Sequence, residues 1–288
     1  MLIICASMAF ICASSFSSFR NHLKLPLCVS LAISESPDVY MISVRNIYKM
    51  LSKDFVFGSE QRALAAMIIF ENENPENWQK TAERTCEIYR KMKREHPFLA
   101  SQQDLATAAL MAMRPEEGDD EFIEEMEKCY SLLTDRFVFS ADVARRACAI
   151  MALDPKHSAE EKCRRFNELY DALKKNKLRL GLDEQLAVLA VLVNLDYSDE
   201  KAVEDVRKYD AFLHKQRGCG DFLMGPHLRR MYAITLSTID SARSEGNAEA
   251  ISSSTSAVIA ILIQIEIALA ISIAASSAAS SASSSSSH

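Results

Sequence analysis

Glycine and proline, the residues that most often mark turns, are scarce in this chain of 288 residues, with only seven of each. No run of alternating β-branched residues occurs before position 257. Barrels and sandwiches need many short strands of that pattern, separated by frequent turn residues. We therefore expect long helices rather than an all-β fold, in a chain that is 49% hydrophobic and 25% charged.

Metal-binding and redox spacings are also missing. The eight cysteines contain no CxxC pair, and the six histidines form neither HxxxH nor HExxH. Cys86, Cys129 and Cys148 fall instead on apolar helical stripes, where cysteine acts as a small hydrophobic residue. We therefore expect no metal or cofactor, and reduced thiols in a cytoplasmic protein.

Catalytic and nucleic-acid signatures are equally absent. The chain has no GxSxG, no GxxxxGK, and no GxGxxG between a strand and a helix, so we predict no catalytic residue. The net charge is −6. Its basic clusters at 90–94 and 174–179 fall at the ends of predicted helices, where cations oppose the negative end of the helix dipole. Nucleic-acid binding is therefore not expected.

A two-helix unit between Phe122 and Leu153 is the clearest pattern that is present. Apolar residues follow Phe122 in steps of three and four, which is the stripe of an amphipathic helix. Acidic residues crowd its start, where the helix dipole favours them, and we interpret them as a solvated helix end rather than a cation site. A second helix begins after the predicted N-cap Ser140 and stops at Asp154-Pro155.

The unit recurs along the chain. Five tyrosines, each late in a first helix, are separated by 41, 41, 40 and 39 residues. An apolar residue follows each tyrosine by three positions, and an alanine follows the first four by seventeen. A small residue at a fixed point of the second helix allows two helices to cross closely. The tyrosines are Tyr48, Tyr89, Tyr130, Tyr170 and Tyr209, and the alanines are Ala65, Ala106, Ala147 and Ala187.

A two-helix period near 40 residues predicts an all-α fold of the α-solenoid type, a right-handed array of antiparallel hairpins similar to HEAT and armadillo repeats. Each hairpin of such an array buries its apolar stripes against its neighbours. We predict that the repeat domain spans residues 15–240, with a linker at 241–256 and a disordered Ser/Ala-rich tail at 276–288. Residues 1–14 are apolar but follow no basic residue, so a covering or poorly ordered segment is favoured over a signal peptide.

The segment from Ala257 to Ala275 is apolar with the single charge of Glu266. As a helix it would span about 28 Å, close to the thickness of a bilayer core. Its central Glu266 and the lack of basic residues after Arg243 oppose insertion, and its alternating isoleucines have the period of a strand. We favour an apolar helix that packs on the repeats or self-associates. The alternatives are a membrane anchor and a β-forming or disordered tail.

One turn is longer than the others by five residues and holds three of the seven glycines. Glycine amides and arginines beside a helix start can bind an anion or a partner's carboxylate. The alternative is a longer turn that lets the last hairpin accept the C-terminal segment. The predicted partner- or anion-binding residues are Arg217, Gly218, Gly220, Gly225, His227, Arg229 and Arg230.

Three stretches of the chain resemble a known family: FSSFRNHLKLPLCVSLAISESPDVY from Phe16 to Tyr40, YRKMKREHPFLASQQDLATAALMA from Tyr89 to Ala112, and the Ala/Ser-rich C-terminus. Together they are similar to the uncharacterised bacterial family catalogued as domain of unknown function 4003, over residues 15–288. The resemblance implies no activity, cofactor or catalytic residue. We therefore expect a scaffold that binds a protein partner. The alternatives are a membrane-associated protein anchored through 257–275, and an enzyme or small-ligand binder with a site on the concave face.

Overall fold

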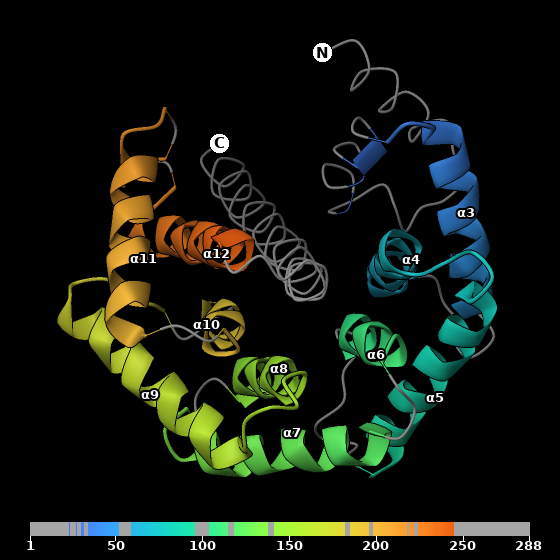
Figure 1. The fold of residues 1–288 in the computed structure, drawn as a ribbon, viewed down its shortest axis with the longest axis horizontal. Coiled ribbons are helices and arrows are strands. Elements are labelled where there is room, and N and C mark those ends of the chain that lie inside the picture. Colours follow the sequence, from blue (N-terminus) through green and yellow to red (C-terminus); the bar gives the residue numbers. More distant parts are fainter. Residues whose placement is uncertain are drawn as a thin grey trace, which may run out of the picture. The chain divides into compact units, whose positions relative to one another are not determined.

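The computed structural model describes residues 23, 27, 30–31, 34–51, 59–95, 104–114, 118–137, 141–181, 185–195, 198–217, 219–221 and 224–244. These residues form ten helices and no strand, which confirms the predicted all-α class (Figure 1). The helices are α3 (Pro37–Met50), α4 (Glu60–Asn72), α5 (Trp78–Glu95), α6 (Leu105–Ala112), α7 (Asp119–Thr134), α8 (Ala141–Ala152), α9 (Ala159–Lys175), α10 (Gln185–Val193), α11 (Asp199–His214) and α12 (Pro226–Ser244).

The chain divides into two compact units, with the boundary inside α5 between Cys86 and Glu87. In the first unit α3 packs against α4. Tyr40 of α3 lies edge-on to Phe70, with 4.6 Å between the ring centroids, and its hydroxyl donates to Glu71 at 2.6 Å. Arg62 of α4 donates to the Tyr48 hydroxyl at 2.8 Å and lies over the tyrosine ring. Polar and aromatic contacts therefore fix this helix pair together.

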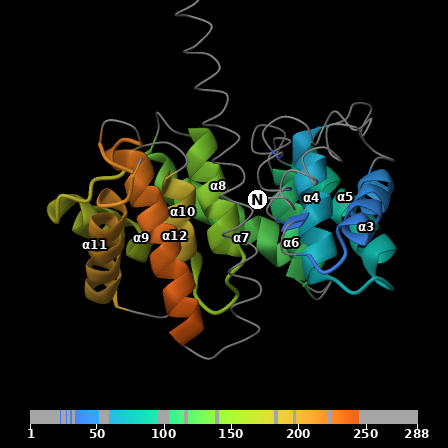
Figure 2. The same ribbon diagram turned by 90° about the horizontal axis from the view of Figure 1, so that it is seen from above.

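In the second unit, successive helices form two layers. The first helices of the hairpins, α7, α9 and α11, pack one after another, and the second helices, α8, α10 and α12, do the same (Figure 1). Figure 2 shows the second helices lengthwise. At the α7–α9 contact, Phe137 lies edge-on to Phe166 and Tyr170. The guanidinium of Arg136 lies over the Tyr170 ring and donates to Asn167 at 3.0 Å.

Local signals explain where the helices start and stop. The side chains of Ser59, Ser158 and Ser198 cap α4, α9 and α11, and Ser158 forms a full capping box with Glu161. Helix α8 ends at Ala152, just before Asp154-Pro155, as predicted. The predicted cap Ser140 lies outside the described residues.

The repeated alanines and cysteines lie in the core, as their positions on the stripes predicted. Ala65, Ala106, Ala147 and Ala187 are all buried. Cys86, Cys129 and Cys148 are buried free thiols, and hydrogen bonding with Cys163 together with burial raises the pKa of Cys129 far above its usual range. A raised pKa disfavours the thiolate, which is the reactive form of cysteine.

Each first helix from α3 to α9 buries the same four positions, which we call the stacking positions: eight, four and one residues before the repeat tyrosine and three residues after it. In α11 these positions carry mostly charge, and Phe212 is 54% exposed. The buried sets are Tyr40, Val44, Ile47 and Leu51; Thr81, Thr85, Ile88 and Met92; Phe122, Met126, Cys129 and Leu133; and Lys162, Phe166, Leu169 and Leu173. The α11 set is Lys201, Asp205, Lys208 and Phe212.

Candidate functional site

A groove of about 510 Å³ opens in the second unit where two interhelical turns meet. One wall is the α6–α7 turn with the first turns of α7, and the other is the α8–α9 turn. The volume is that of a small-ligand or side-chain site. Its lining includes the charged or polar side chains of Arg114, Glu121, Glu125, Asp154, His157 and Ser158. We call this cavity the α7 groove.

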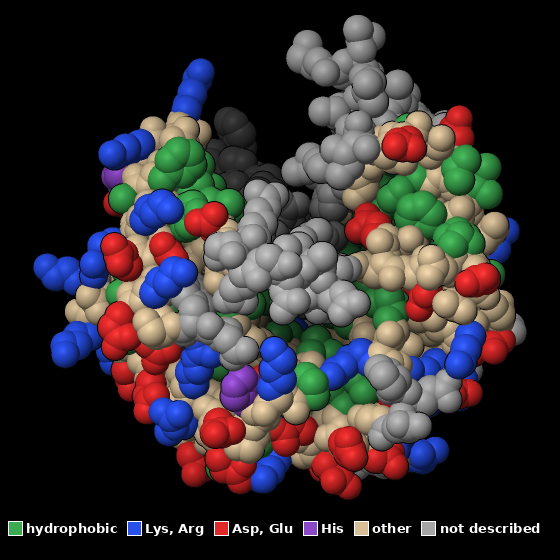
Figure 3. All heavy atoms as spheres, viewed as in Figure 1, with side chains coloured by type: hydrophobic (Ala, Val, Ile, Leu, Met, Phe, Trp, Pro, Cys, Tyr) green, Lys and Arg blue, Asp and Glu red, His purple; other side chains and the backbone are tan. Residues whose placement is uncertain are grey.

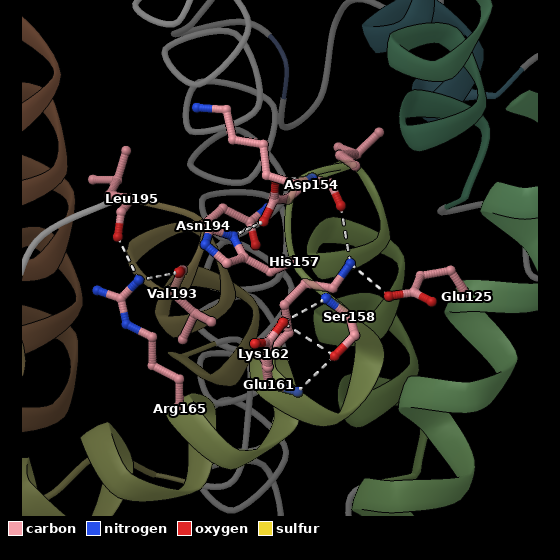
Figure 4. Close-up of polar contacts among 12 residues, drawn as sticks. Glu125, Asp154, His157, Ser158, Glu161, Lys162, Arg165, Val193, Asn194 and Leu195 are labelled. Carbon is pink, nitrogen blue, oxygen red and sulfur yellow. Dashed lines mark hydrogen bonds and ion pairs between the residues drawn. The ribbon is translucent and has the colours of Figure 1, made fainter.

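Asp154 organises the α8–α9 wall of the groove. Its carboxylate accepts a hydrogen bond from the Lys156 amide at 2.9 Å and lies 2.7 Å from His157 Nδ1. Pro155, the residue after Asp154, prevents α8 from continuing. The turn is therefore held by its own side chains, and it presents the imidazole of His157 to the groove (Figure 4).

A buried lysine joins the two walls. Lys162 of α9 is 2% exposed, and its ammonium lies 2.7 Å from Glu125 of α7 while donating to the carbonyl of Asp154 at 2.9 Å (Figure 4). A charge this deep is tolerated only when it is paired and hydrogen-bonded. Glu125 and Lys162 thus fix the position of α7 relative to the α8–α9 turn.

Side chains of other helices bind carbonyls at the ends of the second helices, where the α-helical hydrogen bonding of the backbone runs out. Arg114, at the end of α6, donates to the carbonyl of Leu153, and burial lowers the pKa of this arginine. Asn194, at the end of α10, donates to the carbonyl of Ile150 at 2.8 Å. Arg165 of α9 donates to the carbonyls of Val193, at 2.8 Å, and Leu195 (Figure 4).

The chemistry of the α7 groove favours a cationic group. Three carboxylates, those of Glu121, Glu125 and Asp154, line it against one guanidinium, that of Arg114. Acidic side chains also gather on the surface over α7 (Figure 3). The Ser158 hydroxyl belongs to the capping box, bonded to the Glu161 amide, and is therefore occupied structurally rather than as a nucleophile. Among the described residues no group of three or more His, Cys, Asp and Glu side chains is placed to hold a metal ion.

Two of the arginines predicted to bind a partner or an anion at the long turn contact acceptors of the protein itself. Arg229 is buried and donates to Asp210 at 2.9 Å and to Asp221, and this arginine lowers the pKa of Asp221. Arg230 donates to the carbonyl of Arg179 at 2.6 Å. The protein's own acceptors thus occupy both arginines, and the binding of an external anion or carboxylate there stays a prediction.

The remaining members of that predicted site are spread around the same turn. Arg217 and His227 are exposed, and Gly218 lies outside the described residues. Gly225 has a φ of 76°, the left-handed conformation that favours glycine, immediately before Pro226 starts α12. A Cβ added at Gly220 would meet nothing within 4 Å, so this glycine is not required by close packing.

Sequence reasoning missed the α7 groove because it interpreted its residues one at a time. The acidic start of α7 was interpreted as a solvated helix end, and the histidines, His157 among them, were considered only for metal-binding spacing. A signal was present in the repeat itself. Lys162 occupies a stacking position that is apolar or uncharged in α3, α5 and α7, which marks it as a buried charge that needs a partner.

Within the described ranges, none of the helices has the length and apolar character needed to cross a bilayer. The segment 257–275, for which an anchor was one alternative, lies outside those ranges. A family model described as "Protein of unknown function (DUF4003)" matches residues 11–268, which confirms the resemblance drawn from the sequence. Neither the curated proteins nor the solved structures contain a match to the chain.

Proposed function

The chain belongs to the DUF4003 family, and from that premise we propose that it is an α-solenoid that works as a protein-binding scaffold. The family brings no activity with it, so the proposal depends on the residues of the chain itself. The scaffold would bind one protein partner, with the cytoplasm as its proposed compartment.

The repeated burial of the stacking positions carries this proposal. A linear array needs each first helix to cover the same positions of the one before it, and α3, α5, α7 and α9 all bury them. The successive packing of α7, α9 and α11 supports the same arrangement. An array also needs an end with a polar outer face. Lys201, Asp205 and Lys208 give α11 that face, so we place the end of the first-helix layer there.

The α7 groove favours a binding role over catalysis. Its ionic groups are engaged in fixing helices, as the contacts of Lys162, Glu125 and Asp154 illustrate. Arrays of this kind use extended surfaces to bind other chains. A groove between two turns, with fixed carboxylates and apolar walls, is suited to receive a side chain of a partner protein.

Affinity capture tests the scaffold proposal. Full-length tagged protein, purified from the cells that produce it, is expected to retain a defined protein partner that an unrelated helical protein of the same charge does not retain. Failure to enrich any protein in repeated captures would contradict the proposal.

A small-ligand or enzymatic role is the second candidate, and the pairing of His157 with Asp154 inside the groove favours it. A carboxylate that orients an imidazole is part of many general-base sites. Native mass spectrometry of the purified protein distinguishes this role, since a bound small molecule in place of a protein partner would support it.

The membrane-associated alternative depends on residues 257–275. If these residues form an anchor, deleting residues 250–288 should move the protein from the membrane fraction to the soluble fraction. If they pack on the last hairpin, the deletion should instead lower the melting temperature and cause association in size-exclusion chromatography.

A further inference from the structure

Consecutive first helices carry opposite charges at one register position. Five residues before the repeat tyrosine, α9 has Arg165 and α7 has Glu125. We propose that the α7 groove binds the guanidinium of an arginine supplied by a protein partner, at the junction that corresponds to the one of Arg165 in the next repeat and beside Arg114, which already binds the Leu153 carbonyl. This inference rests on the proposed scaffold function for the origin of the arginine.

Arg165 shows what such a junction binds when the chain supplies the arginine itself. Its guanidinium donates to the carbonyls of Val193 and Leu195 at the end of α10, and its Nε lies 3.4 Å from the Asp199 carboxylate at the start of α11. The two carbonyls that Arg165 binds are seen in Figure 4. A helix end with free carbonyls and a neighbouring carboxylate thus binds one planar cation.

The α7 groove is the equivalent junction one repeat earlier, with Glu125 in place of an arginine at the register position of Arg165. Leu153 and Val193 both lie six residues after a repeat alanine, and Pro155 corresponds to Leu195. Here Glu125 faces the junction, so Arg114 from the end of α6 binds the Leu153 carbonyl instead. The space that an arginine side chain would fill remains open, with a volume of about 510 Å³.

The groups that line this space select a guanidinium over an anion. Glu121 is exposed at the groove. Glu125 contacts Lys162 through Oε1. The carboxylate of Glu121 and the second oxygen of Glu125 can therefore accept hydrogen bonds from an incoming guanidinium. An anion would meet the carboxylates of Glu121, Glu125 and Asp154. The apolar parts of the wall, Met111 and Pro155 among them, suit the aliphatic stem and flat face of an arginine.

The test is a titration of full-length, isotope-labelled protein with N-acetyl-arginine methylamide, followed by amide NMR. We expect saturable shifts at groove residues such as Gly118 and His157, with a dissociation constant on the order of 1–10 mM for a single charged side chain. The citrulline analogue, which has the same shape and no charge, is expected to cause no saturable shift.

Two matched variants locate the binding. Glu121→Gln should weaken it about fivefold, the effect of losing one solvent-exposed charge interaction. Glu124→Gln also removes one negative charge, but from an exposed position of α7 outside the groove lining. This variant should leave the affinity for the arginine probe unchanged. Both positions are exposed, so neither variant is expected to disturb folding.

Equal weakening by both variants would overturn the inference, and so would equal shifts from the citrulline analogue. A titration that does not saturate up to about 50 mM would also overturn it, because one arginine side chain is expected to bind in the millimolar range. The scaffold proposal fails separately. A captured partner whose binding is insensitive to Glu121→Gln and to the arginine probe would leave the scaffold standing without this site. Binding of the arginine probe without any captured partner would support the site and contradict the scaffold proposal.

Discussion

Arg145 and Asp104 form a buried ion pair between α8 and the N-terminal end of α6, with side chains that are 4% and 1% exposed. Each lies two residues before a repeat alanine, Ala147 and Ala106 respectively. The repeat therefore places opposite charges at the same position of consecutive second helices. The pair fixes the register between these helices, because a shift of one helix along the other would separate the two buried charges.

Asp104→Ala should destabilise the protein by about 3–5 kcal/mol, because it leaves the buried guanidinium of Arg145 without its carboxylate. Urea unfolding followed by circular dichroism measures this loss. Glu160→Ala is the control, since it breaks the exposed pair of Lys128 and Glu160 and should cost at most about 1 kcal/mol. Equal losses in the two variants would mean that the buried pair does not hold the helices.

Ala147→Leu should overpack a helix crossing and cost about 1–3 kcal/mol, because Ala147 is fully buried on α8. The matched control is Ala211→Leu, which makes the same change at an exposed position of α11 and should be nearly neutral. The urea midpoints of both variants test this. An unchanged midpoint for Ala147→Leu would place this face of α8 in solvent.

The charged stacking positions of α11 should keep the end of the array soluble. Replacing Asp205 by Phe and Lys208 by Leu copies Phe166 and Leu169 of α9 and extends the apolar surface around the exposed Phe212. We expect concentration-dependent association in size-exclusion chromatography with multi-angle light scattering. Phe212→Gln is the converse change and should not promote association. A doubly substituted protein that elutes as the wild type does at every concentration would show that another surface ends the array.

Tyr209 should make the stability pH-dependent in the alkaline range. Burial, together with donation of its hydroxyl to Asp240 at 2.7 Å, raises the pKa of Tyr209 to about 12. A raised pKa favours the protonated phenol in the folded state. Its stabilising contribution is therefore complete below pH 10, the usual tyrosine pKa, and is lost as the pH rises towards 12. Tyr209→Phe should remove this part of the dependence, and an identical decline from pH 9 to 12 in both proteins would refute the assignment.

The sequence predicted the parts of the fold that depend on local helical pattern. Burial of the repeat alanines and of the Phe122 stripe follows from a period of 3.6 residues, because each apolar stripe has to face a neighbouring helix. The charged residues Lys201, Asp205 and Lys208 of α11 replace residues that are mostly apolar elsewhere in the repeat, a signal in the sequence from which no prediction was made.

The groove and the arginine contacts could not be predicted in the same way. They depend on which side chain reaches a helix end far along the chain, as Arg165 does at Val193, 28 residues away, and Arg114 does at Leu153, 39 residues away. The same limit applies to the long turn. Its glycines and arginines suggested an anion site, but only the structure shows that Asp210 and Asp221 reach Arg229.

The most direct test of the scaffold account is cross-linking mass spectrometry on full-length protein captured with its partner from the cells that produce it. The account expects one defined partner, cross-linked through the exposed Lys156 beside the α7 groove to a segment that contains an arginine. Glu124→Gln should capture this partner as the wild type does, and Glu121→Gln should capture less of it. Recovery of no protein beyond that retained by an unrelated helical protein would contradict the account.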